Sequence, residues 1–176
     1  MRIFVVGTGR CGSSTFYQAC KTITNYTCGH ETFAGQVHNF EYLDNHIEVA
    51  VQNVQALALL QNKYPNNMIV QLIREPKGCI QSLFEQCPEY LKAWSFQVYL
   101  TTEVTEKVAE AYYHCVNQHI AKIPNLVTVR VDDLEWFWAR FIQSIGAECD
   151  MEQAQKILSR KYNPGSKRGR DNYVEN

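Results

Sequence analysis

The sequence predicts an α/β fold of three layers, in which a central parallel sheet lies between two layers of helices. Short apolar runs typical of buried strands alternate along the chain with longer segments whose apolar residues recur at helical spacing. Strands that alternate with helices form parallel sheets that are covered on both faces.

The N-terminal part of the chain contains two predicted strands and one predicted helix. Residues 3–6 indicate the first strand, because this β-branched and aromatic run ends at Gly7. A helix is expected over residues 13–21, since serines stand at its start. Residues 26–28 indicate a weaker second strand.

The middle of the chain is expected to contain a long helix, a strand and a second helix. Residues 45–63 carry apolar residues at helical spacing, and Pro65 ends this pattern. Residues 68–73 predict the third strand. A turn at residues 75–78 then leads into a helix that ends at Glu85.

The C-terminal part continues the alternation. Residues 90–123 are expected to be mostly helical up to Pro124, and residues 126–131 form the clearest later strand. Two helices are expected after it, at residues 133–146 and 150–161.

The composition is that of one soluble globular domain spanning residues 1–176. Hydrophobic residues make up 45% and charged residues 20%, and the length suffices to bury a core. The net charge of -1 argues against a general nucleic-acid binder. The sequence shows no signal segment and no membrane span of roughly 20 apolar residues. We therefore expect a cytoplasmic protein without nucleic-acid or membrane partners.

The seven cysteines are scattered and never spaced as C-x-x-C. Such a pattern suits neither a zinc site nor a disulfide framework. We expect reduced thiols that serve mostly as small apolar side chains, and no bound metal.

A glycine-rich loop separates the first strand from the first helix. A strand that enters such a loop and then a helix exposes several backbone N–H groups in one concavity, where they bind phosphate or sulfate oxygens. Gly7 and Gly12 have the separation of the ATPase phosphate loop, but Ser13 stands where that loop has its lysine. The loss of this lysine and the gain of Arg10 argue against ATP chemistry. The candidate phosphate-binding residues are Thr8, Gly9, Arg10, Cys11, Gly12, Ser13, Ser14 and Thr15.

A second candidate element follows the strand at residues 68–73. Arg74 stands at the end of this strand, and Ser82 follows eight residues later in the next helix. The planar guanidinium of Arg74 offers a fork of donors that suits a phosphate monoester, and Ser82 adds a neutral hydroxyl donor.

The two elements resemble the donor-binding motifs of the sulfotransferases, which use 3′-phosphoadenosine-5′-phosphosulfate (PAPS). Residues 10–14, Arg-Cys-Gly-Ser-Ser, are similar to the 5′-phosphosulfate loop [K/R]-S-G-[T/S]-[T/S], and residues 74–82 are similar to R-[DN]-P-x-[DE]-x-x-x-S. The resemblance implies a P-loop NTPase-like sulfotransferase fold with PAPS as sulfuryl donor and PAP as product. It implies that Arg10 stabilises the leaving group and that Arg74 and Ser82 bind the 3′-phosphate.

Residues 28–32, Cys-Gly-His-Glu-Thr, resemble the C-G-E-E-T string of the tyrosylprotein sulfotransferases. The resemblance implies that Glu31 is the catalytic base. His30 is the alternative base, because a neutral imidazole suits neutral pH.

The basic tail of the chain is similar to the late R-K-G loop of the family, which closes over PAPS. The matching residues are Lys167, Arg168 and Gly169. The alternative for residues 166–176 is a mobile, solvated chain end.

The expected function is thus metal-independent, in-line transfer of a sulfuryl group from PAPS to a hydroxyl or amine acceptor. Two alternatives stay open: a small nucleoside or nucleotide kinase with a modified phosphate loop, and a catalytically silent nucleotide-binding module. We expect an open cleft for a large acceptor such as a saccharide or peptide, contacted by residues 32–44 and 87–113. The sequence does not indicate an oligomeric state.

Overall fold

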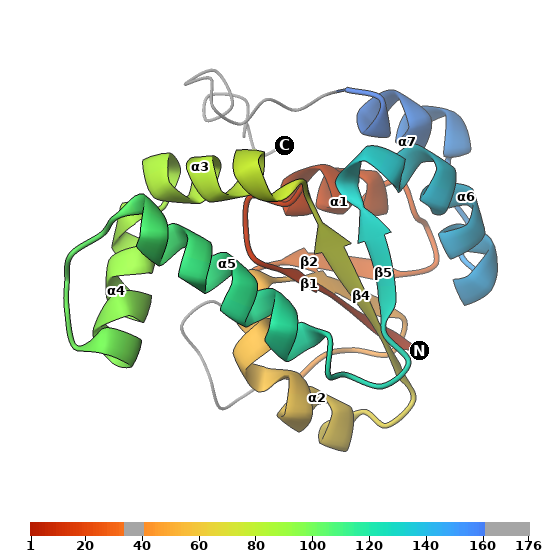
Figure 1. Ribbon diagram of the computed structural model, residues 1–176. Helices are drawn as coiled ribbons and strands as arrows, with labels where there is room; N and C mark the ends of the chain where they lie inside the picture. Colours follow the sequence, from red (N-terminus) through yellow and green to blue (C-terminus); the bar gives the residue numbers. More distant parts are fainter. Residues whose placement is uncertain (34–40, 161–176) are drawn as a thin grey trace.

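In the computed structural model, which describes residues 1–33 and 41–160, five strands form one parallel sheet in the order β2-β3-β1-β4-β5 (Figure 1). The strands are β1 (Arg2–Gly7), β2 (Thr27–His30), β3 (His46–Val49), β4 (Asn67–Ile73) and β5 (Val127–Arg130). After β1 the chain builds one side of the sheet, and with β4 it returns to the other side. The carboxyl end of β1 is therefore a topological switch point, where ligands of open α/β sheets bind.

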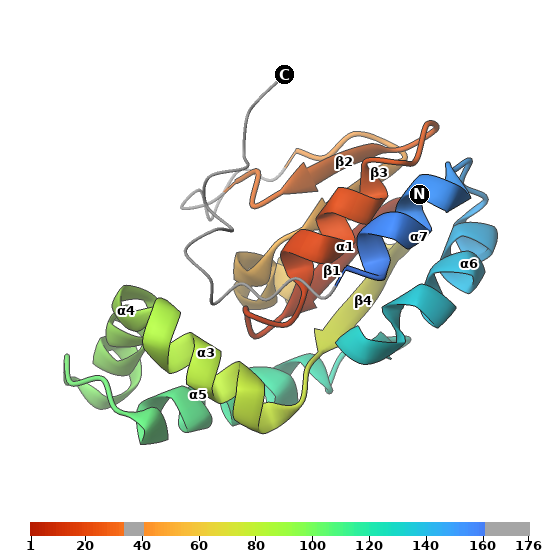
Figure 2. The same cartoon turned by 90° about the horizontal axis from the view of Figure 1, so that it is seen from above.

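Helices cover both faces of this sheet. They are α1 (Ser13–Cys20), α2 (Leu57–Lys63), α3 (Pro76–Gln86), α4 (Pro88–Tyr99), α5 (Glu106–Ile120), α6 (Leu134–Ile145) and α7 (Met151–Leu158), with 3₁₀ helices η1 (Val51–Ala56) and η2 (Val131–Asp133). From above, α1, α6 and α7 lie on one face, and α3, α4 and α5 lie on the other (Figure 2). The three-layer α/β fold predicted from the sequence is confirmed. Within the described part of the chain, no helix is both long and apolar enough to cross a membrane.

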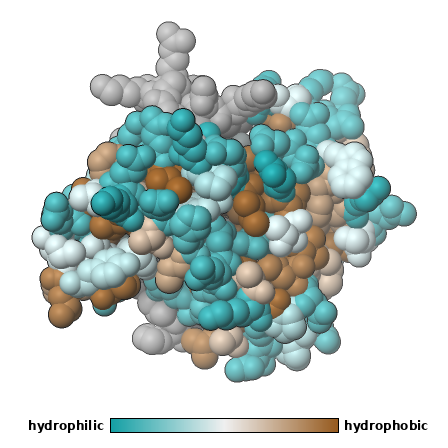
Figure 3. Space-filling view, viewed as in Figure 1, coloured by the Kyte–Doolittle hydropathy of each residue, from teal (hydrophilic) through white to brown (hydrophobic). Residues whose placement is uncertain are grey.

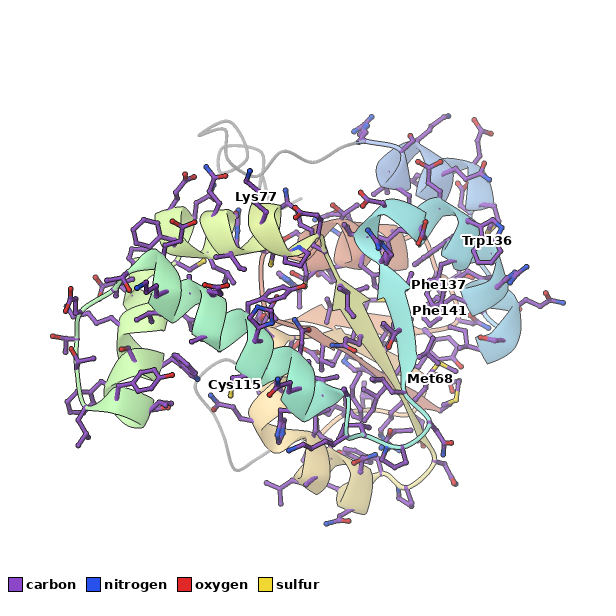
Figure 4. All side chains as sticks on the ribbon, in the orientation of Figure 1. Met68, Lys77, Cys115, Trp136, Phe137 and Phe141 are labelled. Carbon is purple, nitrogen blue, oxygen red and sulfur yellow. The ribbon has the colours of Figure 1, made fainter. Side chains whose placement is uncertain are left out.

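Neighbouring residues of β1 fill two different cores, because side chains alternate along a strand. Ile3 belongs to the core under α1, α6 and α7, whereas Phe4 packs against Tyr42 and Tyr64 on the opposite face. On α6, Phe137 and Phe141 stack with ring centroids 5.5 Å apart, and Figure 4 shows both rings between α6 and β5. Phe141 belongs to the core under α1, α6 and α7, and Phe137 packs against that core.

The prediction of one helix over residues 45–63 is wrong in its first part. Residues 46–49 form β3, and η1 then leads into α2. All four residues of β3 are buried, which is typical of a strand inside a parallel sheet. Ile47, Val51 and Val54 happen to lie at helical spacing, and local periodicity alone cannot separate a short buried strand from a helix.

Two helix boundaries also differ from the prediction. The carboxylate of Glu75 accepts hydrogen bonds of 2.8 and 2.7 Å from backbone N–H groups of the next turn, so α3 begins at Pro76. The helix expected over residues 90–123 is divided into α4 and α5. Leu100 ends α4 with a left-handed φ of 56°, and the Thr105 side chain caps α5.

Candidate active site

The loop between β1 and α1 lies at the switch point, at the carboxyl ends of the strands, where α3 also begins after β4 (Figure 1). Gly9, Arg10 and Gly12 have positive φ angles of 81°, 56° and 88°. Gly12 has no room for a side chain, because a Cβ there would lie 2.4 Å from Cγ2 of Val131. No side chain of the described residues caps α1, so none competes with an anion for its first N–H groups. Such a helix N-terminus favours phosphate or sulfate.

A cavity of about 590 Å³ lies beside this loop. Its walls include several residues that the sequence predicts as donor ligands: Arg10, Gly12, Ser13, Ser14, Thr15 and Arg74. The rest of the wall consists of residues that sequence reasoning did not select: Val131, Asp132, Leu134, Glu135, Leu158, Ser159 and Arg160. The cavity thus combines an anion-binding side with a partly apolar side from η2, α6 and α7.

The two predicted phosphate-binding segments meet at Arg10. Its Nε donates a 3.1 Å hydrogen bond to Oγ of Ser82, and Nη1 of Arg74 donates a 3.3 Å bond to the Arg10 carbonyl oxygen. Nη2 of Arg10 also donates to Oε1 of Gln86 at 2.6 Å. Gln86 was missed by sequence reasoning. It lies four residues after Ser82 on α3, a spacing that places both side chains on one helix face and could have indicated it.

Thr8 and Cys11 are buried beneath the loop and are not among the residues that line the cavity. The Thr8 hydroxyl donates to the Gly9 carbonyl oxygen at 3.1 Å, and Sγ of Cys79 donates to the same oxygen at 3.4 Å. Burial raises the pKa of the Cys11 thiol to about 12, so this thiol is neutral at pH 7. These side chains support the shape of the loop.

Glu31 lies at the carboxyl end of β2, and it is not among the residues that line the cavity. Its N–H donates to the Val49 carbonyl oxygen at 3.1 Å, and its Oε1 accepts a 2.9 Å hydrogen bond from the N–H of Val51. Val51 also borders the phosphate loop, since a Cβ on Gly9 would lie 3.8 Å from its side chain. Burial raises the pKa of Tyr90, and the charge of Glu31 adds to this shift. Glu31 therefore lies beside Val51, at the border of the phosphate loop.

His30 is directed toward α1. Its ring stacks on Tyr17 with centroids 5.1 Å apart. Nε2 of His30 is buried and has no hydrogen-bond partner within residues 1–33 and 41–160. Burial lowers the pKa of His30, although the negative charge of Glu48 opposes this shift. Like Glu31, His30 is not among the cavity residues.

Lys167, Arg168 and Gly169, the residues expected to close over the donor, lie outside the described residues. The same holds for residues 34–40, in the middle of one expected acceptor segment. Among the residues that the structure describes, no group of three or more His, Cys, Asp or Glu side chains could hold a metal ion.

No model of a known protein family matches the sequence, and no curated protein matches it. Among solved structures, the crystal structure of mouse sulfotransferase SULT7A1 complexed with PAP is similar, with a TM-score of 0.54 and 12% sequence identity. The similarity covers 90% of this chain, which spans 64% of the mouse chain. At this identity the likeness shows that the chain has a sulfotransferase-like fold.

Proposed function

We propose that the protein transfers a sulfuryl group from PAPS to a hydroxyl or amine acceptor. The observation that carries this proposal is that the start of α1 and the side chain of Arg74 line the same cavity at the switch point of the sheet. PAPS carries a phosphosulfate on its 5′-oxygen and a phosphate on its 3′-oxygen. Two separate anionic groups need two separate binding elements, and the cavity supplies both. The sulfotransferase-like fold adds support.

Several predicted donor ligands have distinct roles in this proposal. The N–H groups at the start of α1 hold the 5′-phosphate. Arg74 binds the 3′-phosphate with its fork of donors. Ser82 is not among the cavity residues and accepts from Nε of Arg10, and its hydroxyl proton is the further donor that we assign to the 3′-phosphate. Arg10 stabilises the negative charge that develops on the oxygen between sulfur and phosphorus. The apolar part of the wall, at Leu134 and Leu158, suits the nucleobase.

The proposed reaction is a single in-line displacement. The acceptor atom attacks sulfur, the bond from sulfur to the bridging oxygen breaks, and PAP leaves with that electron pair. Glu31 takes the acceptor proton, and its position next to Val51 at the border of the phosphate loop supports this role. His30 has less support, because its ring stacks on α1 and its Nε2 is buried.

A nucleotide kinase is the second candidate, because Asp132 and Glu135 also line the cavity and carboxylates hold magnesium in such enzymes. Two observations count against it. Ser13 stands where the phosphate loop of a kinase has its lysine. An acidic residue after a strand of the sheet helps to hold magnesium in P-loop enzymes. Here the carboxylate after β4, the strand next to β1, is that of Glu75, and it is engaged in capping α3.

For the acceptor we propose an extended molecule, a saccharide or a peptide. A cytoplasmic location is also proposed, since all seven cysteines are free thiols, as is usual in a reducing compartment.

Ligand-induced stabilisation tests the donor. PAP should raise the melting temperature of the full chain with EDTA present, and ATP with magnesium should raise it much less, because a ligand that binds only the native state stabilises it by mass action. At a PAP concentration about 100 times Kd the gain is about 2.7 kcal/mol. A larger shift with ATP and magnesium would favour the kinase. PAP binding without any sulfated product from PAPS and a mixed acceptor panel, detected by mass spectrometry, would favour the silent module.

A further inference from the structure

Glu48 is a completely enclosed carboxylate in β3, next to the strand that leads to Glu31. It lies between Ile47 and Val49 and has 0% solvent exposure. A buried carboxylate is costly unless hydrogen bonds satisfy it, and well-packed apolar residues often serve stability as well or better. A glutamate at this position therefore points to a role beyond stabilising the sheet.

Both oxygens of Glu48 accept hydrogen bonds from Thr32. Oε1 accepts from the Thr32 N–H at 2.8 Å, and Oε2 accepts from the Thr32 hydroxyl at 2.7 Å. Nε2 of His46 lies 3.1 Å from the same Oε2, and Nδ1 of His46 lies 2.8 Å from Oγ1 of Thr27. The carboxylate thus ties the turn after β2 to the interior of the sheet.

Gly29 provides the space for this contact. It is paired with Glu48 in the register of β2 and β3. A Cβ at residue 29 would lie 2.1 Å from Oε2 of Glu48 and 2.3 Å from Oγ1 of Thr32. Only a residue without a side chain lets the carboxylate cross β2 and reach the turn.

Hydrogen bonds hold the backbone at Glu31 and at the residue that follows it. Its own N–H continues the sheet by bonding to Val49, and the next residue, Thr32, is fixed by Glu48. Between these points Glu31 adopts a left-handed φ of 55°. This conformation costs a residue other than glycine roughly 1–2 kcal/mol, and it persists where surrounding contacts determine it. The Thr32–Glu48 hydrogen bonds are contacts of this kind.

We propose that Glu48 is a positioning residue for Glu31, an inference that rests on the proposed function with Glu31 as the base. Glu48 is enclosed and does not touch an acceptor. It acts through Thr32, by holding the turn that sets the direction of the Glu31 carboxylate. Direction matters for a base, since a displacement of about 1 Å at a reacting group can cost on the order of 100-fold in rate.

Variants of Thr32 test this role at the exposed end of the contact, where the fold is least at risk. Thr32→Val keeps the side-chain shape and removes the hydroxyl, whereas Thr32→Ser keeps the hydroxyl. We expect kcat for sulfuryl transfer to fall on the order of 10-fold in Thr32→Val, to fall further in Glu48→Met, which keeps the length of the side chain and removes both acceptor oxygens, and to recover in Thr32→Ser. Kd for PAP and KM for PAPS should stay within about twofold, because none of these residues lines the cavity.

A readout independent of turnover is the hydrogen exchange of the Thr32 amide, measured by NMR on the labelled full chain. The amide should be protected in the wild type and exchange on the order of 10-fold faster in Glu48→Met, which has no oxygen to accept from it. Wild-type kcat in both Thr32→Val and Glu48→Met would overturn the positioning role and leave the proposed function intact. Equal losses in Thr32→Val and Thr32→Ser would also overturn it. A wild type that converts no PAPS with any acceptor would instead overturn the proposed function itself.

Discussion

Arg74 has contacts that suit two roles, binding of the ligand and support of the phosphate loop. Its guanidinium lines the cavity, and it also donates to the carbonyl oxygen of Arg10. A charge-assisted bidentate contact with phosphate contributes roughly 1.5–3 kcal/mol. Arg74→Ala should therefore weaken PAP binding roughly 10- to 100-fold in calorimetry. Adenosine-5′-phosphosulfate, which lacks the 3′-phosphate, should lose much less affinity.

A matched control for this variant is Arg140→Ala, which removes an arginine that lies over the Trp136 ring on α6. It should change the affinity for neither ligand. If Arg74→Ala weakened both ligands equally, Arg74 would serve the loop through Arg10 and not the 3′-phosphate.

Glu31 can be tested without loss of its hydrogen bond to the backbone. Glu31→Gln keeps an oxygen that accepts from the N–H of Val51, but it removes the base. Turnover should fall on the order of 10²–10⁴-fold, the usual range for a positioned acid–base group, while PAP affinity stays nearly unchanged. Steady-state kinetics alongside PAP titrations measure both. Near-normal turnover in Glu31→Gln together with its loss in His30→Ala would transfer the role of base to His30.

Several residues that line the cavity could be selected from local sequence, for a physical reason. Phosphate recognition imposes a local pattern, so Arg10, Gly12 and Arg74 stand out in short segments that resemble the donor motifs of the sulfotransferases. Leu158 and Arg160 carry no such pattern, because they reach the cavity only through the packing of α7 against α1 and α6. Residues that depend on distant contacts were accordingly missed.

The strands also divide into those that local sequence predicts, β1 and β4, and one that depends on distant contacts, β3. The interiors of β1 and β4 are mostly apolar and buried under helices on both faces, so short windows of sequence predict them. β3 contains His46 and Glu48, whose burial is offset by hydrogen bonds with Thr27 and Thr32. These partners lie 19 and 16 residues away along the chain, beyond any local window. A buried polar strand of this kind cannot be recognised before its partners are known.

The break between α4 and α5 has a more local origin. Residues 101–105, Thr-Thr-Glu-Val-Thr, are mostly β-branched residues of low helix propensity, and the chain turns where Leu100 adopts a left-handed φ. After the turn, α5 packs back against α3 and α4. Low local helix propensity and the Thr105 cap therefore favour this boundary, and the packing of α5 against α3 and α4 is consistent with it.

On the scale of the complete fold, α4 presents a surface with several exposed apolar and aromatic side chains. In Figure 3 the α4 end, at the left of the view, shows apolar residues interspersed with pale and hydrophilic ones. The exposed apolar and aromatic residues of this end are Tyr90, Phe96, Val98, Tyr99 and Leu100. Tyr90 lies in the first turn of α4, and we expect an acceptor to extend from Glu31 along these residues.

An acceptor that extends along α4 would gain binding energy away from the reacting group, and such remote energy can be used to raise turnover. We therefore expect a long and a short acceptor with the same reacting group to differ in kcat/KM. A tyrosine-containing peptide or an oligosaccharide should have a kcat/KM about 10-fold or more above free tyrosine or the monosaccharide. Mass spectrometry of the products with PAPS as donor measures the ratio for each pair.

Phe96→Ser, at a half-exposed position on α4, should reduce this ratio of long to short acceptor without changing PAP affinity. Equal kcat/KM values for long and short acceptors would contradict an extended acceptor site on this surface.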